Sequence, residues 1–198
     1  MNAPLLRLHL ERSGWGLALD DEALGRLARF EALLERWNRR INLTRLRSPE
    51  EVLVGHFLDS LAVVPHLGSA RSLIDVGAGA GFPGMVVAVA RPDLAVTLVE
   101  SVGKKAAFLE ALQRELGLDV EVVPRRVEEV IAGGRRFDVA VSRATFEASA
   151  WVAVGRRLVN PEGLVVAMLG REDRVTDGVR WEYALPGIEV RALRLIRA

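Results

Sequence analysis

The sequence contains no cysteine, only two lysines among its 27 basic residues, and no long uninterrupted apolar segment. Without cysteine the chain has no disulfide framework, no thiolate nucleophile and no Cys-ligated zinc, and we expect no bound metal. Arg7, Glu11 and Arg12 interrupt the first 20 residues, which therefore lack the apolar core of a signal peptide. No apolar run approaches the roughly 20 residues that a membrane-spanning helix requires. We therefore expect a cytoplasmic protein without a membrane partner.

Because lysine is so scarce, arginine supplies nearly all of the positive charge. A guanidinium fork suits phosphate better than an ammonium group does, but a compositional bias of the genome gives the same excess. The formal net charge of +1 does not by itself indicate a nucleic-acid-binding protein. Overall charge therefore identifies no partner.

The first third of the chain carries two helical patterns. One begins after Asp20, a candidate N-cap, and is an amphipathic stripe with spacings of three and four residues. The other begins at Ser48-Pro49, where Glu51 completes a capping box, and is expected to end near residue 64. We interpret residues 1–66 as an N-terminal helical extension. The apolar stripe of the first helix consists of Leu24, Leu27, Phe30, Leu34, Trp37 and Ile41.

From residue 72 onward, short apolar runs alternate with helical stretches. Buried strands with helical crossovers predict a parallel sheet with helices on both faces. The tail differs, because two strand patterns at 180–185 and 189–196 flank a Pro186-Gly187 turn and predict an antiparallel hairpin. The other predicted strands are 72–76, 95–100, 120–123, 137–142 and 163–169, with helical segments near 83–90, 102–116, 126–131 and 147–158.

The most informative local motif is DVGAGAGFPG at residues 75–84, where the first of these strands ends. Gly77 and Gly79 allow the backbone to turn tightly and to approach a ligand where a Cβ atom would collide. Asp75 lies near the end of the strand itself. The spacing is G-x-G-x-G, and Phe82 stands where a dinucleotide-binding loop has its third glycine. The motif therefore favours a nucleoside ligand other than a dinucleotide.

Glu100 ends the next predicted strand, 23 residues after Gly77. A carboxylate at this place accepts hydrogen bonds from both hydroxyls of a ribose, and the alternative is a solvated glutamate at a strand end. Together the loop and Glu100 favour S-adenosylmethionine as the cofactor. The order of elements agrees, because a mostly parallel sheet with a C-terminal hairpin matches the class I S-adenosylmethionine-dependent methyltransferase fold, which is Rossmann-like. We predict one compact α/β domain of this class over residues 67–198.

The residues that are missing narrow the choice of methyl acceptor. Without cysteine the covalent route to C5-methylpyrimidines is closed. The strand ending at Ser142 leads into the segment RAT at 143–145 rather than an Asn-Pro-Pro-Tyr-type loop that holds an exocyclic amine. Ribose methylation commonly uses a lysine base, and the only two lysines, at 104 and 105, lie at the start of the predicted helix after Glu100. A ring nitrogen with a free lone pair, such as guanine N7, remains, because it needs positioning rather than deprotonation.

A set of short segments, in a fixed order, covers most of the chain. They are WN at 37–38, NLT at 42–44, HFLDSL at 56–61, the glycine loop, LVESVGKK at 98–105, RVE at 126–128 and FDVAVSRA at 137–144. Together they resemble the bacterial 16S ribosomal RNA guanine-N7 methyltransferases, the RsmG family, also called GidB (glucose-inhibited division protein B). The pairing of N-L-T and H-x-x-D-S-L with D-V-G-x-G-x-G-F-P-G is specific.

The resemblance implies methyl transfer from S-adenosylmethionine to N7 of a guanosine in 16S rRNA of the small ribosomal subunit, with no obligate protein partner. It implies that Gly77 and Phe82 line the methionine and sulfonium side of the cofactor. Val127 and Glu128 would border the adenine, and Arg143 would complete the pocket. The alternatives are a core role for Phe82 and Val127 and an exposed first-turn position for Glu128.

His56 and Asp59 lie three residues apart on one helical face and are, with Arg143, candidates for positioning the substrate. The alternative for His56 is an interface histidine that holds the N-terminal helices on the sheet. Four further polar residues are candidates for contacts with RNA phosphate. The alternative is that they form a solvated helix face without a ligand. They are Arg39, Arg40, Asn42 and Arg45.

Three departures from the family pattern concern the seating of RNA. Leu169 stands where the family usually has lysine, Thr145 displaces a phenylalanine by one position to Phe146, and the segment between the fifth strand and the hairpin is short. Other functions stay open on the sequence alone. They are a methyltransferase of a small molecule or protein, a nicotinamide-dependent oxidoreductase, against which Phe82 argues, and a non-catalytic RNA- or ribosome-binding relic.

Overall fold

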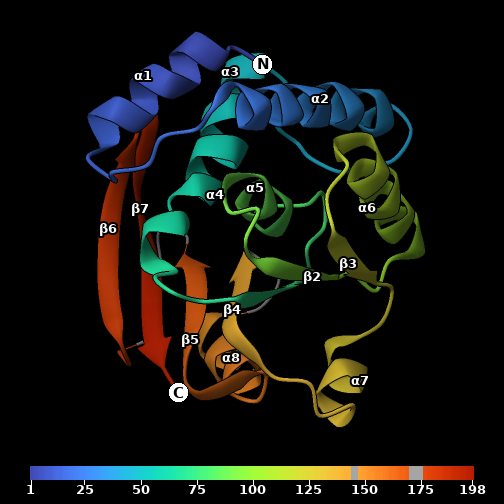
Figure 1. Ribbon diagram of the computed structural model, residues 1–198, viewed down its shortest axis with the longest axis vertical. Helices are drawn as coiled ribbons and strands as arrows, with labels where there is room; N and C mark the ends of the chain where they lie inside the picture. The colour runs from blue at the N-terminus through green and yellow to red at the C-terminus, as the bar shows by residue number, and fades with distance from the viewer. Residues whose placement is uncertain (144–146, 170–175) are drawn as a thin grey trace.

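A computed structural model describes residues 1–143, 147–169 and 176–198 of the chain. The strands are β1 (Ser72–Val76), β2 (Ala95–Val99), β3 (Val120–Val123), β4 (Phe137–Arg143), β5 (Val159–Leu169), β6 (Val179–Leu185) and β7 (Ile188–Arg197). They form one seven-stranded sheet in the order β3-β2-β1-β4-β5-β7-β6 (Figure 1). β1 to β5 run parallel, whereas β7 pairs antiparallel with both β5 and β6. The predicted parallel sheet with a C-terminal hairpin is confirmed.

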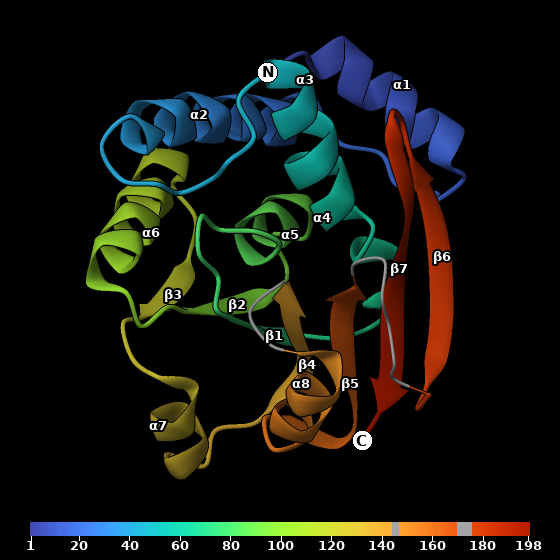
Figure 2. The ribbon, with the colours of Figure 1, turned by 180° about the vertical axis from the view of Figure 1, so that it is seen from behind.

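Helices cover both faces of this sheet (Figures 1 and 2). One face carries α5 (Gly84–Ala90) and α6 (Gly103–Leu116), and the other carries α7 (Val127–Ala132) and α8 (Ala148–Arg156). The N-terminal elements lie over α5, α6 and one end of the hairpin. They are α1 (Ala3–Ser13), α2 (Asp21–Asn38), α3 (Pro49–Val52), the π-helix η1 (Leu53–Leu58), α4 (Asp59–Leu61) and the 3-10 turn η2 (Val64–His66).

The apolar residues of the strands divide between two cores, one on each face of the sheet. Successive strand residues point to opposite faces, so Leu73 packs with the N-terminal helices whereas Ile74 packs with Trp151 on α8. Phe30 of α2 and Phe57 of η1 are fully buried in the first core. The N-terminal helices and the sheet therefore share one continuous apolar interior on this face.

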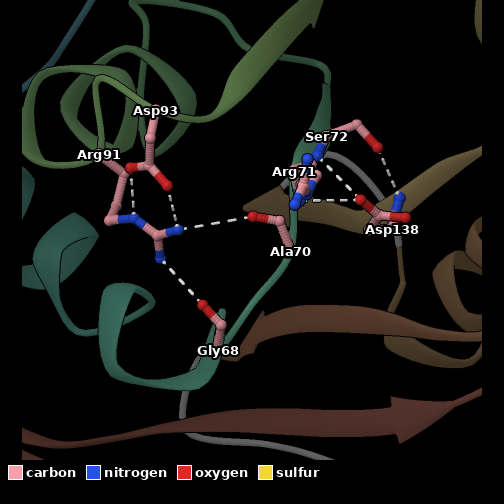
Figure 3. Close-up of polar contacts among 7 residues, drawn as sticks. All are labelled: Gly68, Ala70, Arg71, Ser72, Arg91, Asp93 and Asp138. Atoms are coloured by element: carbon pink, nitrogen blue, oxygen red, sulfur yellow. Dashed lines mark hydrogen bonds and ion pairs between the residues drawn. The ribbon is translucent and has the colours of Figure 1, made fainter.

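Asp138 ties β1 to β4 at the end of the sheet where both strands begin (Figure 3). Its carboxylate accepts hydrogen bonds from the backbone N–H groups of Arg71 and Ser72, at 2.8 and 3.0 Å. In return, the Ser72 hydroxyl accepts one from the Asp138 N–H at 2.9 Å. These bonds, led by the one from Arg71, lower the pKa of Asp138. They fix where β1 starts and hence where it ends.

Arg91 closes the same end of the molecule from the other side (Figure 3). Its guanidinium pairs with Asp93, with a nitrogen–oxygen distance of 2.7 Å, and donates to the carbonyls of Gly68 and Ala70. The segment between η2 and β1 is thus held against the end of α5. These contacts fix the position of the N-terminal helices relative to the start of β1.

The structure corrects three details of the predicted elements. The chain begins with α1, which the sequence pattern did not indicate because only Leu6 and Leu10 are buried in it. The second predicted helix has its capping box at Ser48, but its middle is the π-helix η1 rather than α-helix. β5 begins at Val159 instead of residue 163, because Phe137 pairs with Val159 before the register shifts.

Within the described ranges, no helix combines the length and apolar character needed to span a membrane.

Candidate functional site

The glycine loop follows β1 at the edge of the sheet where the parallel strands end. Gly77, Gly79 and Gly81 have φ angles of 76°, 57° and 88°, which side chains with a Cβ atom rarely adopt. The N–H groups of Gly77 and Ala78 both donate to the Val99 carbonyl, at 2.9 and 3.1 Å. The loop is therefore bound to the end of β2, and its glycines expose backbone to the adjoining cavity.

Asp75 lies beneath this loop rather than on its open side. Its side chain is fully buried, and Oδ2 accepts a hydrogen bond of 2.8 Å from the N–H of Gly84, at the start of α5. Oδ1 has no partner among the described residues. Burial raises the pKa of Asp75 to about 7. Asp75 thus holds the loop and α5 at a fixed distance from β1.

Glu100 follows β2 directly, and its side chain is only 5% exposed. Its two carboxylate oxygens accept hydrogen bonds from the N–H groups of Gly79 and Val102, at 3.0 and 2.8 Å. Two backbone donors thus fix its rotamer, while each oxygen keeps a further lone pair for a ligand.

A cavity of about 380 Å³ opens beside this carboxylate, and we call it the Glu100 cavity. The structure brings to it four of the residues predicted to bind cofactor, from three separate segments of the chain. Val127 is buried at the start of α7, whereas Glu128 is exposed. The lining residues are Val76, Gly77, Val99, Glu100, Ser101, Val102, Lys105, Arg125, Arg126, Val127 and Glu128.

Arg143 ends β4 and points back to the N-terminal helices. Its Nη1 donates to the carboxylate of Asp59 and to the carbonyl of Gly55, both at 3.1 Å. Its Nη2 lies 2.9 Å from Nδ1 of His56. On the far side of Asp59, the Tyr183 hydroxyl donates to Oδ1 at 2.7 Å. The anionic partner of Arg143 is thus Asp59, a residue of the protein itself.

His56 is neutral in this arrangement. Burial, and then the positive charge of Arg143, lower its pKa to about 3. Because a guanidinium only donates hydrogen bonds, Nδ1 of His56 accepts from Arg143 and Nε2 carries the proton. Nε2 lies 2.6 Å from Oγ1 of Thr44, to which it donates.

Asn38 explains why the Asn-Leu-Thr segment reaches this histidine. Its Oδ1 accepts hydrogen bonds from the N–H groups of Leu43 and Thr44, at 2.8 and 3.0 Å, and its Nδ2 donates to the Thr44 carbonyl. The amide of the last residue of α2 therefore folds the following loop back onto the helix. Thr44 is held over η1 as a result.

Phe82 is 4% exposed and lies in a stack of rings. One face meets Phe30 with ring centroids 4.8 Å apart, and the other meets His56 at 4.4 Å. The guanidinium of Arg143 lies 5.2 Å from the ring centroid. The phenylalanine of the glycine loop thus forms the floor under His56 and Arg143, and a cofactor contact by its ring stays a prediction.

A second cavity, of about 620 Å³, lies over the ends of β4 and β5, and we call it the Arg143 cavity. Of the four RNA-binding candidates, only Arg45 lines this cavity. The other three, Arg39, Arg40 and Asn42, are exposed a few residues earlier in the chain. Arg39 forms an ion pair with Glu35. The lining residues are Leu43, Thr44, Arg45, Leu46, Gly55, His56, Asp59, Ser142, Arg143, Glu147, Ala148, Trp151, Ala167, Met168, Leu169, Tyr183 and Arg191.

Thr44, Tyr183 and Arg191 line this cavity but were not among the predicted site residues. Thr44 stands inside the N-L-T segment, which was a usable signal, whereas the two hairpin residues carry no motif. Tyr183 is 124 residues from Asp59. The departures at Thr145 and Phe146 lie outside the described residues, as do residues 170–175 of the short segment before the hairpin.

The two cavities lie on either side of the switch point between β1 and β4, where successive strands change from one side of β1 to the other. From β1 the chain continues to β2 on one side, and β4 lies on the other. In open α/β sheets this switch point, at the carboxyl ends of the strands, is where ligands bind. The arrangement suits a nucleoside on the β2 side and a second reactant on the β4 side.

Comparison with known proteins agrees with this geometry. The model of the GidB family, described as rRNA small subunit methyltransferase G, matches residues 23–177. A protein named ribosomal RNA small subunit methyltransferase G from Anaeromyxobacter sp. (strain Fw109-5) is 44% identical over 85% of this chain and 80% of its own length. A protein of the same name from Myxococcus xanthus (strain DK1622) is 47% identical over 74% of this chain and 69% of its own.

Solved structures resemble this fold at lower sequence identity. An O-methyltransferase from Bacillus cereus in complex with SAH has a TM-score of 0.62 at 14% identity, and the match covers 98% of this chain and 99% of that one. A methyltransferase from Geobacter sulfurreducens has a TM-score of 0.62 at 16% identity, covering 91% and 98%. These likenesses establish the class I methyltransferase fold.

Proposed function

We propose a reaction for this chain, which belongs to the GidB family, rRNA small subunit methyltransferase G. The protein transfers the methyl group of S-adenosylmethionine to N7 of a guanosine in 16S rRNA of the small ribosomal subunit. The observation that carries the proposal is the family match over residues 23–177, which spans the residues of both cavities except the hairpin.

S-adenosylmethionine fits the Glu100 cavity and the loop beside it. Glu100 offers free lone pairs to the ribose hydroxyls, Gly77 and Gly79 let the backbone approach, and Val127 gives the adenine an apolar wall. Glu128 lines the same cavity. Asp75 and Phe82 are buried beneath the loop and would support it, and Arg143 would act from the neighbouring cavity. When bound, the cofactor supplies an electrophilic methyl group on a sulfonium sulfur. These residues would hold the cofactor at the carboxyl ends of β1 and β2.

The acceptor base occupies the Arg143 cavity in this proposal. Guanine N7 has a free lone pair, so the protein needs no general base. The side chains present agree with that, because His56 already accepts from Arg143 and Asp59 is engaged by Arg143 and Tyr183. His56, Asp59 and Arg143 therefore act as positioning residues that shape the cavity. Its walls exclude water and orient the base for in-line attack.

RNA phosphates run past the loop between α2 and α3. Arg45 lines the Arg143 cavity, and Arg39, Arg40 and Asn42 are exposed on the same loop. Guanidinium groups at such positions neutralise phosphate and orient the strand without reading its sequence. Their contribution is expected to fall as salt concentration rises.

The test is methyl transfer to defined ribosomal substrates. Purified protein is incubated with tritiated S-adenosylmethionine and small subunits from a strain that lacks this methylation, and the label is mapped by chemical cleavage at N7-methylguanosine. One labelled guanosine in 16S rRNA is the expected result. Label at another atom, label on protein or small molecules only, or cofactor binding without any turnover would each overturn the proposal.

A further inference from the structure

We propose that the Thr44 hydroxyl donates a hydrogen bond to the carbonyl oxygen O6 of the acceptor guanine and so selects guanine over adenine. This inference rests on the proposed function, because it assumes that the base in the Arg143 cavity reacts at N7. It assigns to the Asn-Leu-Thr segment a direct contact with substrate.

The first step fixes the proton on His56. Arg143 Nη2 lies 2.9 Å from Nδ1 of His56, and a guanidinium has donors only. Nδ1 is therefore the acceptor, and the single proton of the neutral ring is on Nε2. Since Nε2 lies 2.6 Å from Oγ1 of Thr44, the histidine donates and the threonine accepts.

The second step follows from the capacity of a hydroxyl group. Thr44 Oγ1 also accepts a hydrogen bond of 3.1 Å from the N–H of Leu46. A hydroxyl oxygen has two acceptor lone pairs and one donor hydrogen, so both lone pairs are now used. The hydrogen remains, and no acceptor for it is found in the described part of the chain. Thr44 is thus an obligate donor on the wall of the cavity.

The other hydroxyl and indole donors that line the Arg143 cavity already have acceptors within the protein. The Ser142 hydroxyl donates to the Val76 carbonyl at 2.9 Å, and Tyr183 donates to Asp59. The indole N–H of Trp151 donates to the Val166 carbonyl at 2.9 Å. Each of these points its hydrogen into the protein. Among the described hydroxyl and indole groups of this lining, Thr44 is the one whose hydrogen is left for a ligand.

The chemistry of the base then selects guanine. Guanine presents two acceptors, N7 and O6, on one edge, whereas adenine presents N7 and the N6 amino donor. A donor directed at O6 holds the base and leaves the N7 lone pair free for the methyl group. With adenine in the same position, two donors would face each other, and a buried donor without a partner is strongly unfavourable.

The experiment uses the wild-type protein and small subunits reconstituted with a base analogue at the target position. Inosine keeps O6, and 2-aminopurine lacks it while keeping N7. We expect kcat/KM to fall about tenfold or more with 2-aminopurine, the loss of one hydrogen bond, and to change far less with inosine. Equal rates for guanine and 2-aminopurine would overturn this inference while leaving N7 methylation intact. A wild-type protein that does not label guanine at all would overturn the proposed function instead.

Three variants test the ratio of kcat/KM for guanine to that for 2-aminopurine, which would not change if Thr44 had only a structural role. Thr44→Val removes the donor, so the ratio of kcat/KM for guanine to that for 2-aminopurine should fall toward one. Thr44→Ser keeps the hydroxyl and should restore most of the ratio. Thr97→Val makes the same atomic change in β2, where the hydroxyl donates to Glu121 outside both cavities, and should leave the ratio unchanged. A Thr44→Val protein that retains the wild-type ratio would contradict the inference; if that variant does not fold, the wild-type analogue series decides.

Discussion

At the scale of single residues, the carboxylate of Glu100 shows how the protein prepares a ligand site in advance. Two backbone N–H groups already hold its oxygens, from the glycine loop on one side and from the start of α6 on the other. A ligand that binds this carboxylate therefore meets a side chain whose rotamer is fixed. Less conformational entropy is lost on binding than with a mobile side chain.

We predict that Glu100→Gln weakens S-adenosylmethionine binding by about 1.5–3 kcal/mol, the value of a charge-assisted hydrogen bond. The amide has only one acceptor oxygen, so its NH2 group faces one of the two backbone donors. Isothermal titration calorimetry measures the change. Glu115→Gln, an exposed change on α6 outside both cavities, is the matched control and should leave affinity unchanged. Equal affinities of the two variants would remove Glu100 from the site.

His56 makes stability depend on pH in the acid range. Its pKa is about 3 in the folded protein, lower than the ordinary value of 6.5, so the unfolded chain binds more protons between these two values. The stabilisation is complete above pH 6.5 and is lost as pH falls toward 3. Asp75 has the opposite sign, because its folded pKa of about 7 makes the native state bind more protons from pH 4 to 7.

We therefore predict that His56→Gln loses less stability on acidification than the wild type. Between pH 6.5 and 4.5 the difference should amount to roughly 2 kcal/mol, since each pKa unit corresponds to about 1.4 kcal/mol. Urea denaturation at the two pH values measures it. Parallel pH dependence of the two proteins would show that His56 is not held neutral in the fold.

At the scale of elements, the start of α5 depends on a glycine that has no room for a side chain. A Cβ atom on Gly84 would meet Leu98 Cδ2, and it would lie 2.7 Å from Oδ2 of Asp75. Both neighbours are buried, and Asp75 also accepts from the Gly84 N–H. The last glycine of GFPG is thus required by the close approach of α5 to β1 and β2.

Gly84→Ala is expected to destabilise the protein by about 1–3 kcal/mol through overpacking. Gly103→Ala is the matched control, because Gly103 begins α6 with no atom within 4 Å of the added methyl group. That change should be neutral or slightly stabilising. Thermal unfolding of the two variants provides the comparison. Similar melting temperatures would show that α5 shifts easily and does not fix the loop.

Element type was predictable from sequence wherever the apolar pattern was long or framed by turn residues. Each predicted strand is present, although β5 begins at Val159 instead of residue 163, because short apolar or alternating runs between turn residues leave few alternatives. The π-helix η1 was not predictable, since its widened turn has the same apolar pattern as an α-helix. His56 on η1 and Asp59, the first residue of α4, both reach Arg143.

At the scale of the whole molecule, the C-terminal hairpin completes a cavity whose other walls come from residues 43–59 and from β4, α8 and β5. Tyr183 of β6 donates to Asp59, and burial together with that carboxylate keeps the pKa of Tyr183 well above its ordinary value. Trp15, after α1, contacts both Trp181 and Tyr183. The hairpin therefore packs against Trp15 and binds Asp59, and so connects the N-terminal helices to the side of the Arg143 cavity.

We predict that Tyr183→Phe lowers stability by about 1.5–3 kcal/mol, because the buried Asp59 carboxylate loses a donor. It should also lower kcat/KM for the small subunit severalfold, since Asp59 orients Arg143. Asp138→Ala is the control, because it breaks the bonds of Figure 3 at the opposite end of the sheet. It should cost comparable stability while leaving kcat/KM nearly unchanged below the unfolding transition. Equal kinetic effects would show that Tyr183 acts only through stability.

The sequence by itself determined the sheet, the glycine loop and the carboxylate after β2. These features follow from backbone conformation and strand order, which depend on residues close together in the chain. Only the tertiary structure decided which groups face one another: that Arg143 meets His56 and Asp59, that Tyr183 binds Asp59 from 124 residues away, and that no described residue accepts the Thr44 hydrogen. The reason is that the protonation and donor direction of a side chain are set by its partners in space, and no local pattern records them.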